Sequence, residues 1–261
     1  MDFKEFLINA LLLQSWFPDL KSYWGFNPVS WSISCEMFFY VFFVFLLWVG
    51  TRNLIALTLI LLLAVVVLQV ELYGDVSYWI FYISPVSRLL EFLFGMLVFR
   101  AYLLVKDGGG VSYLVASWME IASITIVALA MGNAIFTDVG KNFRFSLYYL
   151  FPMTFIVFAF SFDRGVLSRL LANRVLVYLG ESSYCLYMIH LMFLGYVIPR
   201  LFIDIDKNSI VSVLVVLALM AVCIVPLSCL LHSAVEKPLN KYLKSIFIRG
   251  SRTVQTTASA G

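Results

Sequence analysis

Residues 53–72 read NLIALTLILLLAVVVLQVEL, and this stretch decides the fold class of the chain. It contains one charged residue, Glu71, and a helix of about 20 apolar residues is what crosses the hydrocarbon core of a bilayer. Of the 261 residues, 62% are hydrophobic and 13% are charged, and the mean hydropathy is +0.97. A soluble domain is roughly half apolar and about a quarter charged. The composition therefore predicts a polytopic membrane protein and excludes a soluble domain, a disordered chain or a nucleic-acid-binding protein.

Seven stretches of the sequence are long and apolar enough to cross a bilayer. Because lipid offers no hydrogen-bond partners, each spanning segment must satisfy its own backbone groups as a helix. We therefore expect an all-α transmembrane helix bundle, preceded by a short or incomplete helix over residues 3–17. One domain over 1–248 and a disordered cytoplasmic tail over 249–261 complete the predicted organisation. The predicted spans are 30–49, 53–72, 79–105, 115–133, 145–162, 183–203 and 209–232.

Basic residues are distributed unevenly between the loops that these spans create. Of the 18 Lys and Arg, Arg88 lies inside a span, twelve lie on one side and five on the other. Since cytoplasmic loops carry the excess of Lys and Arg, the side with twelve, which includes the C-terminal tail, is predicted to be cytoplasmic. Residues 163–177 are predicted to lie along the inner surface as an amphipathic helix. The five residues on the predicted outer side are Lys21, Lys141, Arg144, Arg200 and Lys207.

Cysteine spacing and the first residues of the chain add two expectations. The cysteines lie in apolar stretches, without a CxxC pair or the spacing of metal ligands, so we expect neither disulfides nor a metal site. The N-terminal residues carry mixed charge, and no small-residue cleavage site follows them, so they do not resemble a signal peptide. The four cysteines are Cys35, Cys185, Cys223 and Cys229.

Ionisable residues inside two of the predicted spans are candidates for function, because burying such groups in lipid costs several kcal/mol unless they are paired or hydrated. Glu36 lies about two turns into its span, and Ser32, four residues earlier, shares its helix face. Arg88 and Glu91 are three residues apart and also share a face. A plain intrahelical ion pair is the structural alternative to a functional site at these two residues.

A third helix carries a polar stripe, in which Ser183, Tyr187 and His190 follow one another at helical spacing. Three helices with polar faces indicate a shared polar cavity, although a polar passage through the bilayer fits the same residues. A histidine near carboxylates suits general-base chemistry on a hydroxyl, or a proton relay. The structural alternative is that His190 simply makes a hydrogen bond to a neighbouring carbonyl. Glu120 and His232 fall near the ends of their spans, where we expect their side chains to snorkel towards the interface.

Four segments that contain these residues resemble motifs of the acyltransferase 3 family. Residues 31–36 (WSISCE) resemble its Trp-Ser-x-Ser-x-Glu segment, and residues 88–96 (RLLEFLFGM) its Arg-x-x-Glu-Phe-x-x-Gly-Met segment. Residues 179–190 (LGESSYCLYMIH) are similar to its Gly-x-x-Ser-Tyr-x-x-Tyr-x-x-His segment, and residues 236–238 (EKP) to its closing Glu-x-Pro. The motifs occur in the family's order and cover essentially the whole chain.

This resemblance implies an integral-membrane O-acyltransferase of the bacterial inner membrane, which acts on surface polysaccharides and related glycans. It implies an acyl-CoA donor, usually acetyl-CoA, a carbohydrate hydroxyl as acceptor, the lipid bilayer as surroundings, and no metal or nucleic acid. It also implies roles for the residues above. Catalytic roles fall to Arg88, which would stabilise developing charge, Glu91, which would orient it, and Glu36. Substrate-lining roles fall to Trp31, Ser32, Ser183, Tyr184, Tyr187 and His190.

The sequence departs from the family pattern at its start. The family generally begins with two further spans, the first of which carries an Arg and a His taken to be catalytic, and no segment here matches them. We therefore expect this polypeptide by itself to be inactive or strongly impaired, and a separate polypeptide that supplies the two helices is one expected partner. Acetyl transfer by the purified chain would refute that expectation.

Two other classes of protein fit the same residues. One is a transporter or flippase of a polar or lipid-linked substrate that uses Glu36, Arg88 and His190 as a relay. The other is a structural membrane subunit. Proton-coupled uptake that depends on Glu36 would indicate the transporter.

Overall fold

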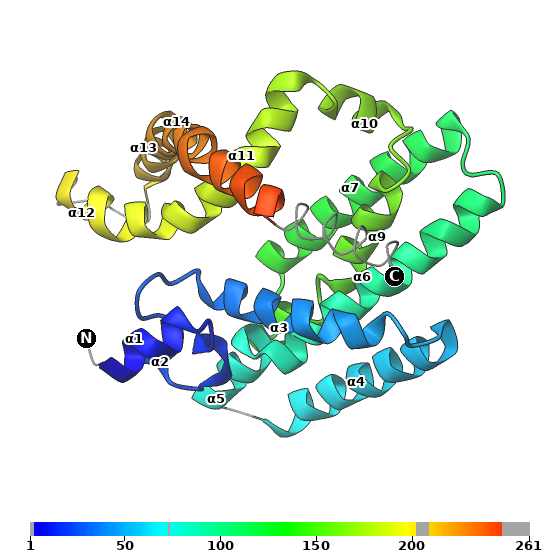
Figure 1. Cartoon of the computed structure of the whole chain (residues 1–261), viewed down its shortest axis with the longest axis horizontal. Coiled ribbons are helices and arrows are strands. Elements are labelled where there is room, and N and C mark those ends of the chain that lie inside the picture. Colours follow the sequence, from blue (N-terminus) through cyan, green and yellow to red (C-terminus); the bar gives the residue numbers. More distant parts are fainter. Residues whose placement is uncertain (1–2, 73, 202–208, 247–261) are drawn as a thin grey trace, which may run out of the picture. The chain divides into compact units, whose positions relative to one another are not determined.

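The computed structural model describes residues 3–72, 74–201 and 209–246, and every regular element within these ranges is a helix (Figure 1). This result confirms the predicted all-α fold. The predicted tail 249–261 and Lys207 lie outside the described residues. The chain divides into two compact units, Met1–Asn173 and Arg174–Gly261, and each is described by itself.

The first unit contains ten α-helices and two short helical turns within its described residues. The predicted N-terminal helix is present but short, since α1 ends at Ala10. The elements are α1 (Phe3–Ala10), a 3-10 turn (Gln14–Trp16), α2 (Leu20–Tyr23), α3 (Trp31–Leu46), α4 (Thr51–Glu71), α5 (Asp75–Tyr78), a π-helical segment (Trp79–Ile83), α6 (Pro85–Asp107), α7 (Tyr113–Phe136), α8 (Lys141–Ser146), α9 (Leu150–Phe160) and α10 (Val166–Leu171).

The second unit begins with the long helix α11, which starts nine residues before the predicted span 183–203. Its last helical run extends to Ile246, well beyond the predicted end at residue 232. The elements are α11 (Arg174–Met192), a π-helical segment (Phe193–Val197), α12 (Ile198–Leu201), α13 (Ile210–Leu219), a π-helical segment (Met220–Ile224), α14 (Val225–Leu231) and a π-helical segment (His232–Glu236).

Five helical runs among the described residues are long and apolar enough to cross a membrane, so the chain is an integral membrane protein. Two predicted spans do not meet the same standard. The helix α3 is apolar but has 16 residues, and α6 has 23 residues but includes Arg88, Glu91, Arg100 and Lys106. The total of seven spans stays a prediction. The five runs are Thr51–Glu71, Tyr113–Phe136, Lys141–Phe160, Arg174–Val197 and Ile210–Ile246.

Proline explains why several helical runs change their winding. Each of the four π-helical segments in the described residues ends two residues before a proline. The pyrrolidine ring collides with the carbonyl four residues earlier and lacks the N–H that would bond to it. A locally wider turn relieves that collision. The four prolines are Pro85, Pro199, Pro226 and Pro238.

Pro85 also corrects the predicted span 79–105, which is not one continuous helix. Because a residue before proline disfavours the helical conformation, Ser84 is extended, with φ −60° and ψ 129°, and α6 starts at Pro85. At the break, carbonyl oxygens of the segment Trp79–Ile83 accept from side chains: that of Ile80 from Ser87, that of Tyr82 from Arg88 and that of Ile83 from Cys35. The break therefore creates polar contact points beside Arg88.

The central helix of the first unit is α6, which contacts α3, α4 and α9 (Figure 1). On one side Leu90 packs into a cluster with Val65 of α4 and Leu150 of α9. On another side Leu93, which is fully buried, packs with a second cluster from α3 and α4. Since lipid is as apolar as these side chains, close packing holds the helices together. The packing fixes the part of α6 that carries Arg88 and Glu91.

Glu120 of α7 is fully buried, so the prediction that it snorkels is wrong. Its carboxylate accepts hydrogen bonds from the backbone N–H groups of Gly165 at 2.9 Å, Leu167 at 2.8 Å and Ser168 at 3.2 Å, and from the Ser168 hydroxyl. These donors form the start of α10, where helix N–H groups have no partner inside the helix. The carboxylate therefore ties α10 to α7 within the bundle.

The predicted amphipathic helix over 163–177 is also corrected by this arrangement. The structure has a short α10 over Val166–Leu171 in its place, and α11 starts separately at Arg174. The helix starts at Val166 because Gly165 and Glu120 cap it, and it is anchored to α7 at that end.

Gly165→Ala is expected to destabilise the protein by about 2 kcal/mol, as overpacking of a buried site does. A Cβ at this position would lie 2.1 Å from the carboxyl carbon of Glu120, which is held by its hydrogen bonds. The matched control is Gly140→Ala at the start of α8, where an added Cβ meets nothing within 4 Å. Thermal unfolding in detergent measures both. In a Glu120→Ala background, Gly165→Ala should lower stability by less. An unchanged loss of stability would show that the Glu120 carboxyl group is not what the added Cβ meets.

His232 in the second unit is buried as well, so the prediction that it snorkels is wrong too. Its Nδ1 lies 3.0 Å from Oε2 of Glu236, and its Nε2 lies 3.7 Å from Oε2 of Glu181 on α11. The Cys185 thiol donates to the same Glu236 oxygen at 3.1 Å. These contacts join α11 to the run that contains α14. The Nδ1 of His232 is paired by them, whereas its buried Nε2 makes no hydrogen bond within the described residues.

Candidate functional site

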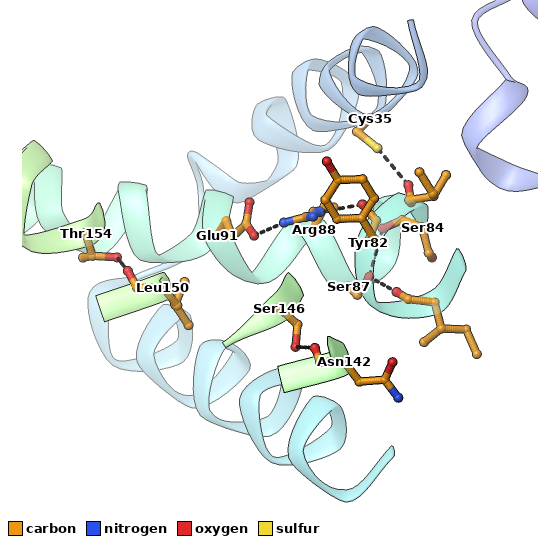
Figure 2. Close-up of polar contacts among 12 residues, drawn as sticks. Cys35, Tyr82, Ser84, Ser87, Arg88, Glu91, Asn142, Ser146, Leu150 and Thr154 are labelled. Atoms are coloured by element: carbon orange, nitrogen blue, oxygen red, sulfur yellow. Dashed lines mark hydrogen bonds and ion pairs between the residues drawn. The ribbon is translucent and has the colours of Figure 1, made fainter. Parts of the chain in front are cut away.

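The guanidinium of Arg88 is held in place from two directions (Figure 2). Its Nε donates a hydrogen bond of 2.8 Å to the carbonyl oxygen of Tyr82, which the break before Pro85 leaves available. Its Nη1 forms an ion pair with Oε1 of Glu91, one turn further along α6. The Arg88 side chain is 14% exposed and that of Glu91 46%. The sequence-predicted pair is therefore present, with a largely buried cation and an open carboxylate.

Aromatic rings surround the same guanidinium. Its central carbon lies 5.0 Å from the ring centroid of Tyr82 and 5.7 Å from that of Trp31 on α3. The faces of aromatic rings attract cations, and the attraction grows when water is excluded. Burial raises the pKa of Tyr78, whose ring lies 5.2 Å from that of Tyr82, to about 12, and Tyr82 adds to the shift. The rings keep the Arg88 charge in a site that is shielded on one side.

A cavity of about 390 Å³ opens beside this ion pair, between α6, α8 and α9. Arg88 and Glu91 line it, together with Arg144 of α8 and Tyr149. Two hydroxyl groups in its wall are already used: Ser146 donates to the Asn142 carbonyl at 2.9 Å and Thr154 to the Leu150 carbonyl at 2.6 Å (Figure 2). The remaining polar wall is dominated by charged groups that can face a ligand.

The predicted residues on α3 fall into two groups. Trp31 lies beside the site, since its ring is 5.0 Å from that of Tyr82 and under the Arg88 guanidinium, but it does not line the cavity, and its substrate-lining role stays a prediction. Ser32 donates to the Val29 carbonyl at 3.0 Å and does not line the cavity. Glu36 is half-buried, makes no ion pair among the described residues and does not line the cavity either. Its predicted role at the site stays a prediction.

The polar stripe of α11 lies in the second unit. Ser183 and Tyr184 are exposed, and Tyr184 lines a separate, largely apolar pocket of about 310 Å³ with Cys185 and Glu236. The ring of Tyr187 lies 5.6 Å from that of His190. Nδ1 of His190 lies 2.5 Å from the Tyr187 carbonyl oxygen. Since a carbonyl only accepts, Nδ1 carries the proton and Nε2 of a neutral ring keeps a free lone pair.

Arg144 is a residue of the site that the sequence interpretation missed. The loop charges predict an outer-loop position for Arg144, whereas the structure places it in the cavity wall. A signal was present in the sequence: Arg144 lies among aromatic residues in FRFSLYY, residues 143–149. An arginine between rings is often held against them, and here its guanidinium lies 5.6 Å from the Phe145 centroid.

These groups suit the stabilisation of an oxyanion. A fixed guanidinium beside a cavity can donate hydrogen bonds to an oxygen that gains negative charge. Among the described residues, no group of three His, Cys, Asp or Glu side chains is placed to hold a metal ion.

The chain is a helical membrane protein in which a largely buried arginine lies at the wall of a cavity. Comparison with known proteins identifies its family. Residues 3–232 match the family model of the acyltransferase 3 family, which is described as an acyltransferase domain. The match covers most of the chain, so the chain belongs to this family.

A named relative agrees with this assignment. The chain is 28% identical over 261 residues to acyltransferase MdmB of Streptomyces mycarofaciens, in an alignment that covers 90% of this chain and 63% of the relative. The chain therefore spans less than two thirds of that protein. No solved structure matches the chain.

Proposed function

We propose that the protein takes part in membrane-bound acyl transfer from a coenzyme A thioester, in the first instance acetyl-CoA, to a hydroxyl of a surface carbohydrate or glycan. The observation that carries the proposal is the Arg88 guanidinium, fixed by Tyr82 and Glu91 at the wall of a cavity in a chain of this family. Buried charge of this kind is costly in a membrane protein and is a functional site by default.

The chemistry assigns each group a task. The acceptor hydroxyl loses its proton to a base as its oxygen attacks the thioester carbonyl, and the CoA thiol leaves. The carbonyl oxygen carries negative charge in between, and a donor fixed in advance lowers that barrier. We assign this donor role to Arg88, with Glu91 as the residue that orients it. We leave His190 a lining role, beside Ser183, Tyr184 and Tyr187.

The membrane and the partners belong to the same proposal. The charge asymmetry of the loops supports a cytoplasmic C-terminus, and the family supports the bacterial inner membrane. A cytoplasmic acyl-CoA donor, a carbohydrate acceptor and a separate polypeptide that contributes helices are the proposed partners.

The test compares host cells that carry the intact gene with cells from which it is deleted. Membranes from each receive acetyl-CoA labelled in the acetyl group, and label in the carbohydrate fraction is counted. We expect label in the intact strain, loss of most of it on deletion, and return when the gene is restored. Equal labelling with and without the gene would rule the proposal out. Uptake of a glycan or lipid-linked sugar that depends on the gene, without acetyl transfer, would support the transporter instead.

A further inference from the structure

Arg144 differs from Arg88 in having no ion-pair partner among the described residues. It is half-buried and contacts the ring of its neighbour Phe145. It lines the 390 Å³ cavity beside Arg88 and also a second cavity of about 440 Å³. Arg144 therefore lies where the two cavities adjoin.

The charges that line the two cavities do not cancel. Arg88 is neutralised by Glu91, which lines the first cavity. The residues that line the second cavity include no carboxylate. Arg144 leaves one positive charge in excess. An unpaired cation that is partly removed from water is unfavourable inside a membrane protein. A bound anion would offset that cost.

A second donor lines the same two cavities as Arg144. Tyr149 lines both cavities, and its hydroxyl makes no hydrogen bond within the described part of the chain. A guanidinium fork and a hydroxyl together match the oxygens of a carboxylate or a phosphate, because each presents N–H or O–H donors to acceptor oxygens. The other hydroxyl groups of the cavity, Ser146 and Thr154, donate to carbonyls of their own helices, and that of Ser146 also accepts from Gln69.

We propose that Arg144 and Tyr149 bind an anionic group, a carboxylate or a phosphate, on one of the two substrates. This inference rests on the proposed function in one respect, which is that the bound molecule is a substrate of acyl transfer. Two aromatic rings connect the two cations. The Tyr82 ring lies against the Arg88 guanidinium, and its centroid is 5.0 Å from that of Phe145. The Phe145 ring in turn contacts the Arg144 guanidinium. A ligand anchored at Arg144 therefore reaches towards the Arg88 guanidinium within one cavity. The anion belongs either to an acidic or phosphorylated sugar or to coenzyme A.

The test measures binding, so that it does not depend on acyl transfer. The full chain in lipid nanodiscs is titrated by calorimetry with glucuronate, glucose 1-phosphate, coenzyme A and, as the neutral control, glucose. We expect at least one anion to bind more tightly than glucose, and Arg144→Gln to weaken that binding by about tenfold or more, as loss of a charged hydrogen bond does. The anion that binds identifies the acceptor or the donor as the source.

The matched control is Lys141→Gln, which removes the same charge from the same helix at an exposed position that does not line either cavity. It should bind the anion as the wild type does. Tyr149→Phe should weaken binding by a smaller factor. If Arg144→Gln does not fold, Arg144→Lys replaces it, and a point charge in place of the fork should still weaken binding severalfold.

Two results would overturn the proposal: no anion binds better than glucose, or Lys141→Gln loses as much affinity as Arg144→Gln. The proposed function can fail separately. If anion binding in nanodiscs depends on Arg144 but host membranes show no gene-dependent acetyl transfer, the anion site stands and the proposed function is wrong.

Discussion

Glu120→Ala is expected to lower the stability of the protein by on the order of 3 kcal/mol, which exceeds the usual cost of a lost helix cap. The substitution leaves three backbone N–H groups and one hydroxyl without their acceptor at the start of α10. They lie at a buried site, where unmade hydrogen bonds are costly. A protein of this size should lose roughly 6–12 °C of thermal midpoint from that change.

The measurement is the thermal midpoint in detergent, and Glu71→Ala is the control. Glu71 is an exposed glutamate at the end of α4, and its removal should change stability by about 0.5 kcal/mol or less. Glu120→Gln, which keeps the size of the side chain, should fall between the two. Equal midpoints for Glu120→Ala and Glu71→Ala would show that the carboxylate does not hold α10.

The helices themselves could be predicted from the sequence, because lipid leaves a spanning chain no other way to satisfy its backbone. The segment 53–72 became α4 with boundaries within two residues. The pair Arg88 and Glu91 could be predicted too, since residues three apart on a helix face each other. Both conclusions depend on local geometry alone.

The rest depends on contacts between distant parts of the chain. Glu120 and Gly165 are 45 residues apart. The residues around each of them give no sign that Glu120 caps the helix that follows Gly165. The sequence predicts a loop position for Arg144, because a count of Lys and Arg does not distinguish a residue that sets topology from one that lines a cavity. The break before α6 could have been predicted, since the Ser84-Pro85 pair disfavours helix at Ser84.

Arg88→Lys is expected to reduce acyl transfer in host membranes by about 100-fold or more, the cost of losing one oxyanion donor. Lysine keeps the positive charge but has no planar fork, so it cannot bond to the Tyr82 carbonyl and Glu91 as Arg88 does. The loss should appear in kcat more than in KM, because the donor acts on charge that exists in the transition state.

The control is Arg100→Lys on the same helix. Arg100 bonds to the Thr51 hydroxyl at 2.8 Å and to the Val49 carbonyl at 2.5 Å, and it does not line the cavity. Both substitutions conserve charge and remove the same fork. The thermal midpoint of each variant is recorded, so that misfolding is separated from lost chemistry.

The ratio of the acetyl-transfer rates of Arg88→Lys and Arg100→Lys tests whether the Arg88 guanidinium at the cavity supports acyl transfer. We expect the initial rate of acetyl transfer, at saturating acetyl-CoA, to fall by about 100-fold in Arg88→Lys and by less than about threefold in Arg100→Lys. Equal rates in the two variants, with both proteins folded, would contradict this role of Arg88.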